Sequence, residues 1–242
     1  MLIQQAYFVK QILSNWTKSQ SQSIFWDIMS HNNISPSIAS SITAIQKQRT
    51  FVILKPDAVL RGLSGAILTR FENRGLKIVA LKMLRADKAT LQKHYPVENL
   101  EWTKRLGSKG KLAFESVGLD INEFEPNFDE ATMGQKVVNS LIEYMLSGPI
   151  ICMVIEGIES VASVRQMVGA TLPTMAQIGT IRGDYSVDFP VVGLAQGRAL
   201  HNLIHASETP QEAQSEINLW FTQSEITDYQ LGNEAVMYSR YY

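Results

Sequence analysis

The chain has 242 residues, a hydrophobic content of 45% and a formal net charge of −1 at pH 7. This length fits one large domain, or one ordinary domain with additions, and the apolar content is sufficient for a packed core. The near-zero charge provides no basic surplus, so we expect neither a nucleic-acid partner nor a membrane surface as partner.

The single cysteine, Cys152, excludes an internal disulfide and a multi-cysteine metal site, and its apolar neighbours indicate a packing role. No run approaches the roughly 18 apolar residues of a membrane span. The N-terminus lacks the pattern of a secretory signal. These features predict a cytoplasmic protein.

Residues 1–48 form an N-terminal extension that differs from the main domain, residues 49–242. Apolar residues near its start follow a roughly helical spacing, and aromatic residues such as Trp16 and Trp26 add area that favours burial. We expect one or two small helices that pack on the domain or on a partner subunit. A partly ordered tail is the alternative.

In the first part of the domain, residues 50–54 predict a buried strand that ends at Lys55-Pro56-Asp57. Residues 61–75 predict a helix that ends at a glycine, and residues 76–83 predict a second strand. Asp87 is placed to cap a short helix that leads to His94 and Tyr95.

Residues 97–134 predict an ordered insertion with little regular structure, because apolar residues are scattered among Gly, Asn, Asp and Glu. Residues 135–146 then predict an amphipathic helix, residues 150–155 a strongly apolar third strand, and residues 160–168 a short helix.

The rest of the chain is predicted as an irregular loop at 169–173, a linker after Tyr185, and a helix that runs to Trp220. A capping box, Thr209-Pro210-Gln211-Glu212, begins this helix, and the tail 225–242 is expected to cross the domain surface. Alternating strands and helices with short joints predict an α+β fold with helices over one face of a sheet.

Polar residues at the ends of these elements are the candidates for a functional site. His205 follows a short apolar run, where an imidazole can be half buried and still reached from outside, as a nucleophile requires. Each cation alone is more often solvated surface. Together the residues provide donors around a transferring phosphoryl group and an in-line acceptor. The set is Lys55, Tyr95, Arg165, Thr171, Arg182, Asn202 and His205.

Several motifs resemble those of the nucleoside diphosphate kinase family, in the order in which that family has them. The Asn-x-x-His-x-Ser and Thr-Ile-Arg-Gly-Asp segments are specific when they occur together. The matching segments are 51–57 with Arg61-Gly62, His94-Tyr95, Ser147-Gly148-Pro149, 179–184, 202–207 and Leu219-Trp220-Phe221.

The resemblance implies a ferredoxin-like βαββαβ sandwich with an antiparallel four-stranded sheet. It implies that His205 takes a phosphoryl group from ATP or another nucleoside triphosphate and passes it to a nucleoside diphosphate. By the same resemblance, Mg²⁺ is held mainly by the nucleotide phosphates, with no dedicated metal ligands in the protein, and the subunits form hexamers or tetramers of dimers. Lys55, Tyr95, Arg165, Thr171, Arg182 and Asn202 would contact the nucleotide, and Glu216 and Ser207 would orient or support His205.

The chain departs from the family pattern in four places. The insertion at about 97–134 is long, about ten extra residues separate Arg182 from His205, and residues 1–48 have no counterpart in minimal members. Ala170 and Leu172 replace a glutamate and an asparagine of the family loop, which alters hydrogen bonds around the site.

Three other functions share some of these features. His201 and His205 have the i, i+4 spacing of a helical zinc pair, but Asn202 stands where zinc proteases have their glutamate. A catalytically weak nucleotide-binding or assembly module would share the fold. A nucleic-acid binder lacks the basic surplus it would need. His94 and His31 are interpreted as structural.

Overall fold

The computed structural model describes residue 35, residues 37–38 and residues 47–238. The chain divides into two units, Met1–Gln46 and Lys47–Tyr242, and the description covers nearly all of the second. Most of residues 1–48, for which one or two helices were predicted, lie outside the described residues. Within the described part, the helices are too short or too polar to cross a membrane.

The described domain alternates strands and helices along the chain. In order, the elements are β1 (Gln48–Leu54), α4 (Pro56–Leu60), α5 (Ser64–Asn73), β2 (Lys77–Leu84), α6 (Lys88–His94), α7 (Leu100–Glu115), α8 (Ile121–Phe124), α9 (Glu130–Leu146), β3 (Ile150–Gly157), α10 (Ser160–Val168), η1 (Pro173–Met175), α11 (Ile181–Tyr185), α12 (Pro190–Ala195), β4 (Ile204–Ala206), α13 (Pro210–Trp220), η2 (Gln223–Glu225) and α14 (Glu234–Tyr238).

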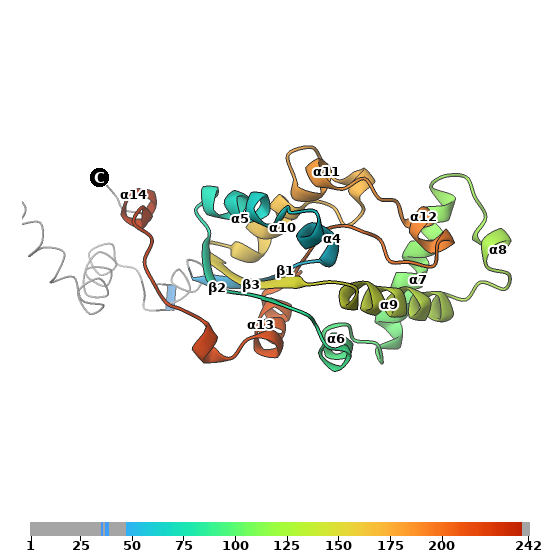
Figure 1. The fold of residues 1–242 in the computed structure, drawn as a ribbon, viewed down its shortest axis with the longest axis horizontal. Coiled ribbons are helices and arrows are strands. Elements are labelled where there is room, and N and C mark those ends of the chain that lie inside the picture. Colours follow the sequence, from blue (N-terminus) through green and yellow to red (C-terminus); the bar gives the residue numbers. More distant parts are fainter. Residues whose placement is uncertain (1–34, 36, 39–46, 239–242) are drawn as a thin grey trace, which may run out of the picture. The chain divides into compact units, whose positions relative to one another are not determined.

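The sheet formed by the described residues has four strands in the order β2-β3-β1-β4, and each neighbouring pair is antiparallel. Strands β1 and β2 are separated in the sheet by β3, with α5 on the connection between them (Figure 1). This is the ferredoxin-like α+β arrangement, which confirms the predicted fold class.

Helices cover both faces of the sheet, so the prediction of helices over one face is wrong. Successive side chains of β1 point to opposite faces, and all of its last five residues are buried. Phe51 and Ile53 join a cluster with side chains of α6, α9 and α13, which we call the α13-side core. Val52 and Leu54 join a second cluster with side chains of α5 and α10.

Several local signals are confirmed. Asp87 caps α6 by accepting from the N–H of Thr90, and Gly75 follows α5 with a positive φ of 82°. Thr209 caps α13 as predicted, but its box is half formed, because Glu212 accepts from the N–H of Glu208 instead.

The C-terminal tail crosses the surface as predicted, along the edge strand β2. The N–H of Thr227 donates to the carbonyl of Val79, and Lys77 donates to the carbonyl of Tyr229. The tail therefore hydrogen-bonds to one end of this sheet edge.

The insertion is helical, which contradicts the prediction of little regular structure for residues 97–134. Its glycines lower helix propensity, but they permit two helices to touch. A Cβ atom at Gly107 of α7 would lie 2.0 Å from the carbonyl oxygen of Glu130, and one at Gly134 of α9 would lie 1.9 Å from that of Thr103. Close backbone packing explains why these positions are glycine.

The linker predicted after Tyr185 also contains a helix, α12, and this helix packs on α7 (Figure 1). A third apolar cluster joins the two additions to each other. Its members are Phe114, Ile121 and Met133, with Phe128, Val137, Val191 and Leu194 packed around them. The extra segments therefore form one packed unit beside the sheet.

The close packing of α7 on α9 predicts opposite effects at two glycines of the same helix. Gly107→Ala forces a methyl group into the Glu130 carbonyl, and we expect the free energy of unfolding to fall by about 1–3 kcal/mol. Gly110→Ala meets only side-chain atoms of Leu194 and Met133 at 3.5 and 3.6 Å, so the higher helix propensity of alanine is expected to leave stability equal or raised by up to about 1 kcal/mol. Urea denaturation of both variants measures the difference, and equal effects would contradict the packing.

Candidate active site

His205 lies in the middle of the edge strand β4, opposite Ile53 of β1. Because side chains alternate along a strand, the imidazole points to the α13 side of the sheet while Ile204 and Ala206 point to the other. The His205 side chain is 21% exposed, so it is fixed by packing and still reachable.

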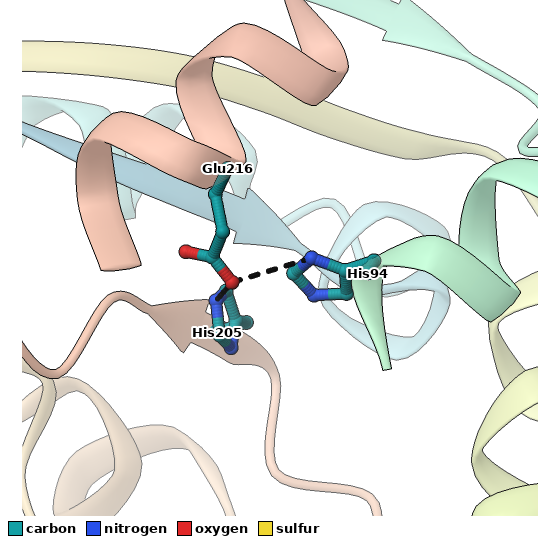
Figure 2. A group of neighbouring side chains, drawn as sticks. All are labelled: His94, His205 and Glu216. Carbon is teal, nitrogen blue, oxygen red and sulfur yellow. Dashed lines mark hydrogen bonds and ion pairs between the residues drawn. The ribbon is translucent and has the colours of Figure 1, made fainter. Parts of the chain in front are cut away.

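Glu216 of α13 holds one nitrogen of this imidazole. Its Oε1 lies 2.8 Å from Nε2 of His205, and Ser207 donates to its other oxygen at 2.5 Å. Figure 2 shows Nδ1 of His205 pointing away from Glu216. This nitrogen has no hydrogen-bond partner among the described residues.

His94 at the end of α6 is a site residue that the sequence interpretation missed. Its Nδ1 lies 3.2 Å from the same Oε1 of Glu216, so one oxygen faces two histidines (Figure 2). The two imidazole rings are 4.7 Å apart and nearly perpendicular, at 83°. The only signal in the sequence was the position of His94 beside Tyr95 at a helix end.

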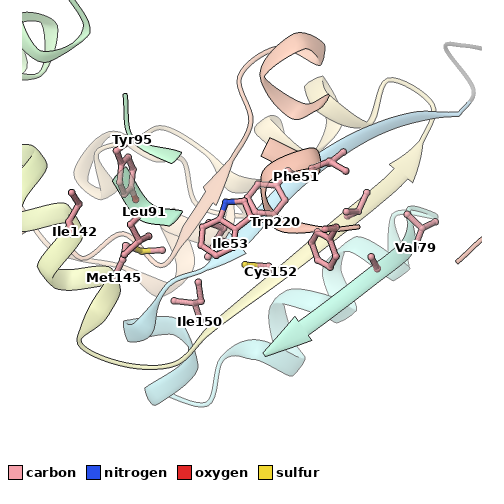
Figure 3. Packing of buried hydrophobic residues seen from close by; sticks show 14 of the residues in the cluster. Phe51, Ile53, Val79, Leu91, Tyr95, Ile142, Met145, Ile150, Cys152 and Trp220 are labelled. Atoms are coloured by element: carbon pink, nitrogen blue, oxygen red, sulfur yellow. The ribbon is translucent and has the colours of Figure 1, made fainter. Parts of the chain in front are cut away.

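Burial keeps both histidines neutral. It lowers the pKa of His205 to about 3, and the positive charges of Lys55, Arg182 and Arg165 act in the same direction. Burial and the neighbouring His205 lower the pKa of His94 to about 3. The α13-side core encloses them with Phe51 and Trp220, which stack at 6.0 Å (Figure 3). A neutral His205 retains the lone pair that a nucleophile needs.

A strained turn precedes β4. Leu203 has a φ of +69°, and the N–H of Ile204 donates to the carbonyl of Asn202 across it, which is the strained form of the γ-turn. Both polar atoms of Leu203 are held by the Lys-Pro-Asp segment. Asp57 accepts from its N–H at 3.2 Å, and the N–H of Lys55 donates to its carbonyl at 2.8 Å.

Lys55 and Asn202 form a buried polar pair next to this turn. The ammonium of Lys55 donates to Oδ1 of Asn202 at 2.7 Å, and Nδ2 of Asn202 donates to the carbonyl of Thr171. Burial, and then the charge of Arg182, lowers the pKa of Lys55 to about 7. The ammonium of Lys55 is therefore placed in the site with little solvation, which makes its charged form less stable than in water.

Arg182 is buried and binds three backbone carbonyls, those of Gly169, Asn202 and Ile204. Burial, and then the charge of Arg165, lowers its pKa to about 10. Its guanidinium thus ties the loop at 169–173 to the strand of His205. The loop contacts the site through the backbone carbonyls of Gly169 and Thr171. The departures from the family pattern at Ala170 and Leu172 therefore leave these hydrogen bonds in place.

The remaining predicted residues lie around this centre. Arg165 of α10 is half exposed and lies 3.5 Å from Glu208. Tyr95 is buried, its ring contacts His94 at 4.7 Å, and it stacks at 6.4 Å on Trp102 of α7. The fold thus brings the predicted site residues around β4, and the insertion reaches Tyr95 through Trp102.

His94, His205 and Glu216 are also close enough to ligate a metal ion, since their ligand atoms lie within 4.8 Å of one another. The hydrogen bonds of Glu216 already account for this cluster. The helical zinc pair is excluded by geometry, because His205 belongs to a strand and His201 stacks on Tyr144 at 4.7 Å.

The site holds a neutral imidazole that is fixed through one nitrogen and open at the other, and buried cations lie beside it. This arrangement is expected of a phosphotransferase that works through a histidine. The antiparallel sheet that carries it agrees with the comparisons with known proteins. The family model for nucleoside diphosphate kinase matches residues 48–102 and 113–226.

Individual relatives agree with the family model. A nucleoside diphosphate kinase from Pyrobaculum aerophilum is 45% identical over 181 residues, which are 75% of this chain and 98% of that one. The crystal structure of an NDP kinase from the same organism has a TM-score of 0.71 and 42% identity, over 75% of this chain and all of that one.

A Borrelia burgdorferi nucleoside-diphosphate kinase, described as a transition state mimic with bound vanadate and ADP, has a TM-score of 0.64 and 35% identity over 79% of this chain and 97% of that one. The chain belongs to the nucleoside diphosphate kinase family. Its function is phosphoryl transfer from nucleoside triphosphates to nucleoside diphosphates.

The strained turn generates a prediction at Asp57. In Asp57→Ala the N–H of Leu203 loses its acceptor, and we expect the free energy of unfolding to fall by about 1–3 kcal/mol together with slower phosphoryl transfer. Asp57→Asn retains an acceptor oxygen and is the matched control, with a smaller loss of both. Denaturation and initial rates measure the pair, and two variants that behave like the wild type would contradict the role of the clamp.

Proposed function

We propose that His205 carries the phosphoryl group between the two nucleotides. The observation that carries the proposal is that Glu216 binds Nε2 and leaves Nδ1 without a partner among the described residues. The Nδ1 lone pair attacks the γ-phosphorus, the bond to the bridging oxygen breaks, and the nucleoside diphosphate leaves with the electron pair. A second nucleoside diphosphate then attacks the phosphohistidine, so one histidine serves both half-reactions.

Lys55, Arg165 and Arg182 are proposed to bind phosphate oxygens, where charge develops during the transfer. Asn202 and Thr171 are proposed to contact the nucleotide, and Asn202 also holds Lys55 in position. Tyr95 is proposed to contact the nucleotide, and Trp102 on the insertion extends the rim beside it. Ser207 and Glu216 orient the imidazole.

We propose Mg²⁺ as the metal. The protein's own ligand cluster, His94, His205 and Glu216, is rich in nitrogen, whereas Mg²⁺ prefers oxygen. Asp57 accepts two backbone N–H groups, which leaves it unsuited to a metal. These contacts fit a cation that nucleotide phosphates hold, and when bound it would neutralise phosphate charge.

The partners proposed are ATP and other nucleoside tri- and diphosphates, as in the relatives described with ADP and with CDP. Assembly into hexamers or tetramers of dimers and a cytoplasmic location stay predictions. The alternative, a catalytically weak nucleotide-binding or assembly module, is less favoured because His205, Lys55, Arg182 and Asn202 are all present in one network.

The proposal predicts a phosphoenzyme that depends on one residue. Wild-type protein incubated with γ-labelled ATP is expected to gain an acid-labile, base-stable label, and initial rates are expected to give the parallel double-reciprocal lines of a ping-pong mechanism. His205→Ala is expected to lose both label and transfer while it remains folded. Intersecting lines, or substantial transfer by the folded variant, would refute the role of His205.

Lys55 generates a prediction about pH. Because its pKa lies at about 7 in the free enzyme, part of the protein lacks this charge near neutrality, and phosphate binding favours the charged form. Affinity for ADP is therefore expected to fall as pH rises, by up to about ten-fold per pH unit above 7, with proton uptake on binding.

Titration calorimetry in two buffers of different ionisation enthalpy, between about pH 7.5 and 8.5, measures this uptake above the pKa of the nucleotide phosphate itself. Lys55→Arg retains its charge throughout this range and is expected to take up no proton at this position. An affinity for ADP that does not change with pH in the wild type would overturn the assignment.

A further inference from the structure

We propose that His94 is a positioning residue for phosphoryl transfer, because it donates a hydrogen bond to the carboxylate that fixes the ring of His205. The inference rests on the proposed role of His205 and assigns a role to a histidine that the sequence marks as structural. The carboxylate is that of Glu216, whose Oε1 faces both imidazoles.

Two groups compete for Nδ1 of His94. Oε1 of Glu216 lies 3.2 Å away and requires a proton on this nitrogen, whereas the indole N–H of Trp220, 3.4 Å away, requires its lone pair. The contact with Trp220 has the geometry of a hydrogen bond, whereas the carboxylate is nearer and charged, and charge-assisted hydrogen bonds are about twice as strong as neutral ones. The shorter distance and the charge of the carboxylate favour a proton on Nδ1.

The other nitrogen of His94 supports the same tautomer. Nε2 is buried and has no hydrogen-bond partner within the described part of the chain. With the proton on Nδ1, this atom is an unpaired acceptor. With the proton on Nε2, it would be an unpaired donor, and Glu216 would face a lone pair in place of an N–H. The second tautomer would keep the hydrogen bond from the indole of Trp220, whereas the first gains the contact with a charged carboxylate, which contributes more than a neutral partner.

In this tautomer Glu216 faces three donors: Nε2 of His205 and Oγ of Ser207 hydrogen-bond to it, and the Nδ1–H of His94 lies 3.2 Å from its Oε1. Burial raises the pKa of Glu216, and His94 and Ser207 act in the opposite direction. The carboxylate must stay ionised to accept the Nε2 proton of His205. The donor from His94 supports that state and fixes the carboxylate in one orientation.

The His94 ring also restricts His205 directly, since the rings meet edge to face at 4.7 Å. The charged and titratable groups that face His94 are Glu216 from α13, His205 from β4, Lys55 at the end of β1 and the neighbouring Tyr95. With Glu216 ionised and His94 neutral, a shift in the pH dependence of transfer therefore reports on this carboxylate.

The test compares His94→Leu, which removes the donor, with His94→Asn, whose amide N–H takes the place of Nδ1–H. Leu91→Ala, on the same helix and in the same apolar cluster, is the control for lost packing. Melting temperature and the rates of phosphoenzyme formation and discharge as functions of pH are measured for each protein. ¹⁵N NMR of the wild type shows which ring nitrogen of His94 carries the proton.

We expect His94→Leu to slow both half-reactions by about ten-fold to a hundred-fold, as loss of a hydrogen bond to a charged group implies. In this variant, the fall of the transfer rate at low pH is expected to begin at a higher pH, because Glu216 protonates more readily without the donor. His94→Asn is expected to recover most of the rate, and Leu91→Ala to lower the melting temperature while the rate stays near that of the wild type.

Wild-type rates in His94→Leu, equal losses in both His94 variants, or a proton on Nε2 in the NMR spectrum would each overturn the inference. The NMR result does not depend on activity. If the wild type forms no phosphoenzyme, the proposed function fails, while the tautomer of His94 is still decided by its spectrum.

Discussion

The hydrogen bond between His205 and Glu216 joins the edge strand β4 to helix α13, and the site is arranged around it. It exists because alternation along β4 turns the imidazole to the α13 side, opposite Ile53. A one-residue slip of this short strand would turn His205 to the other face and break the bond. The register of β4 is therefore the constraint on which the chemistry depends.

The backbone before β4 bears the strain of this register. The turn at Leu203 has a positive φ, which costs free energy for a branched residue, and the surrounding contacts stabilise it. Asp57, Lys55 and Arg182 bind the backbone of 202–204 from two directions. Residues that the sequence presents as phosphate ligands thus also position the strand.

Burial of two cations also costs free energy in this region. Burial lowers the pKa values of Lys55 and Arg182, so in the nucleotide-free protein each loses solvation of its charge. Perturbed pKa values of several groups in one place are typical of a functional site. The cost is offset when an anion binds, which is how a site built for phosphate differs from a surface cluster of cations.

The sequence by itself determined three of the four strands, several helix ends and most of the residues that the fold gathers around His205. Apolar runs, capping residues such as Asp87 and Thr209, and motifs at element ends are local signals, which a chain carries before it folds. The tertiary structure decided the rest. Helices cover both sheet faces because β1 is apolar on both sides, and periodicity alone does not show which helix packs where.

Tertiary packing also decided that the insertion is helical and that His94 lies next to Glu216. Gly107 and Gly134 weaken helix propensity locally, yet two helix backbones that touch leave no room for a Cβ, and this contact exists only in the folded chain. His94 is far from Glu216 in sequence and joins it only when α6 and α13 pack on the same side of the sheet. Long-range contacts of this kind carry no local pattern, so the sequence shows the residues but not their partners.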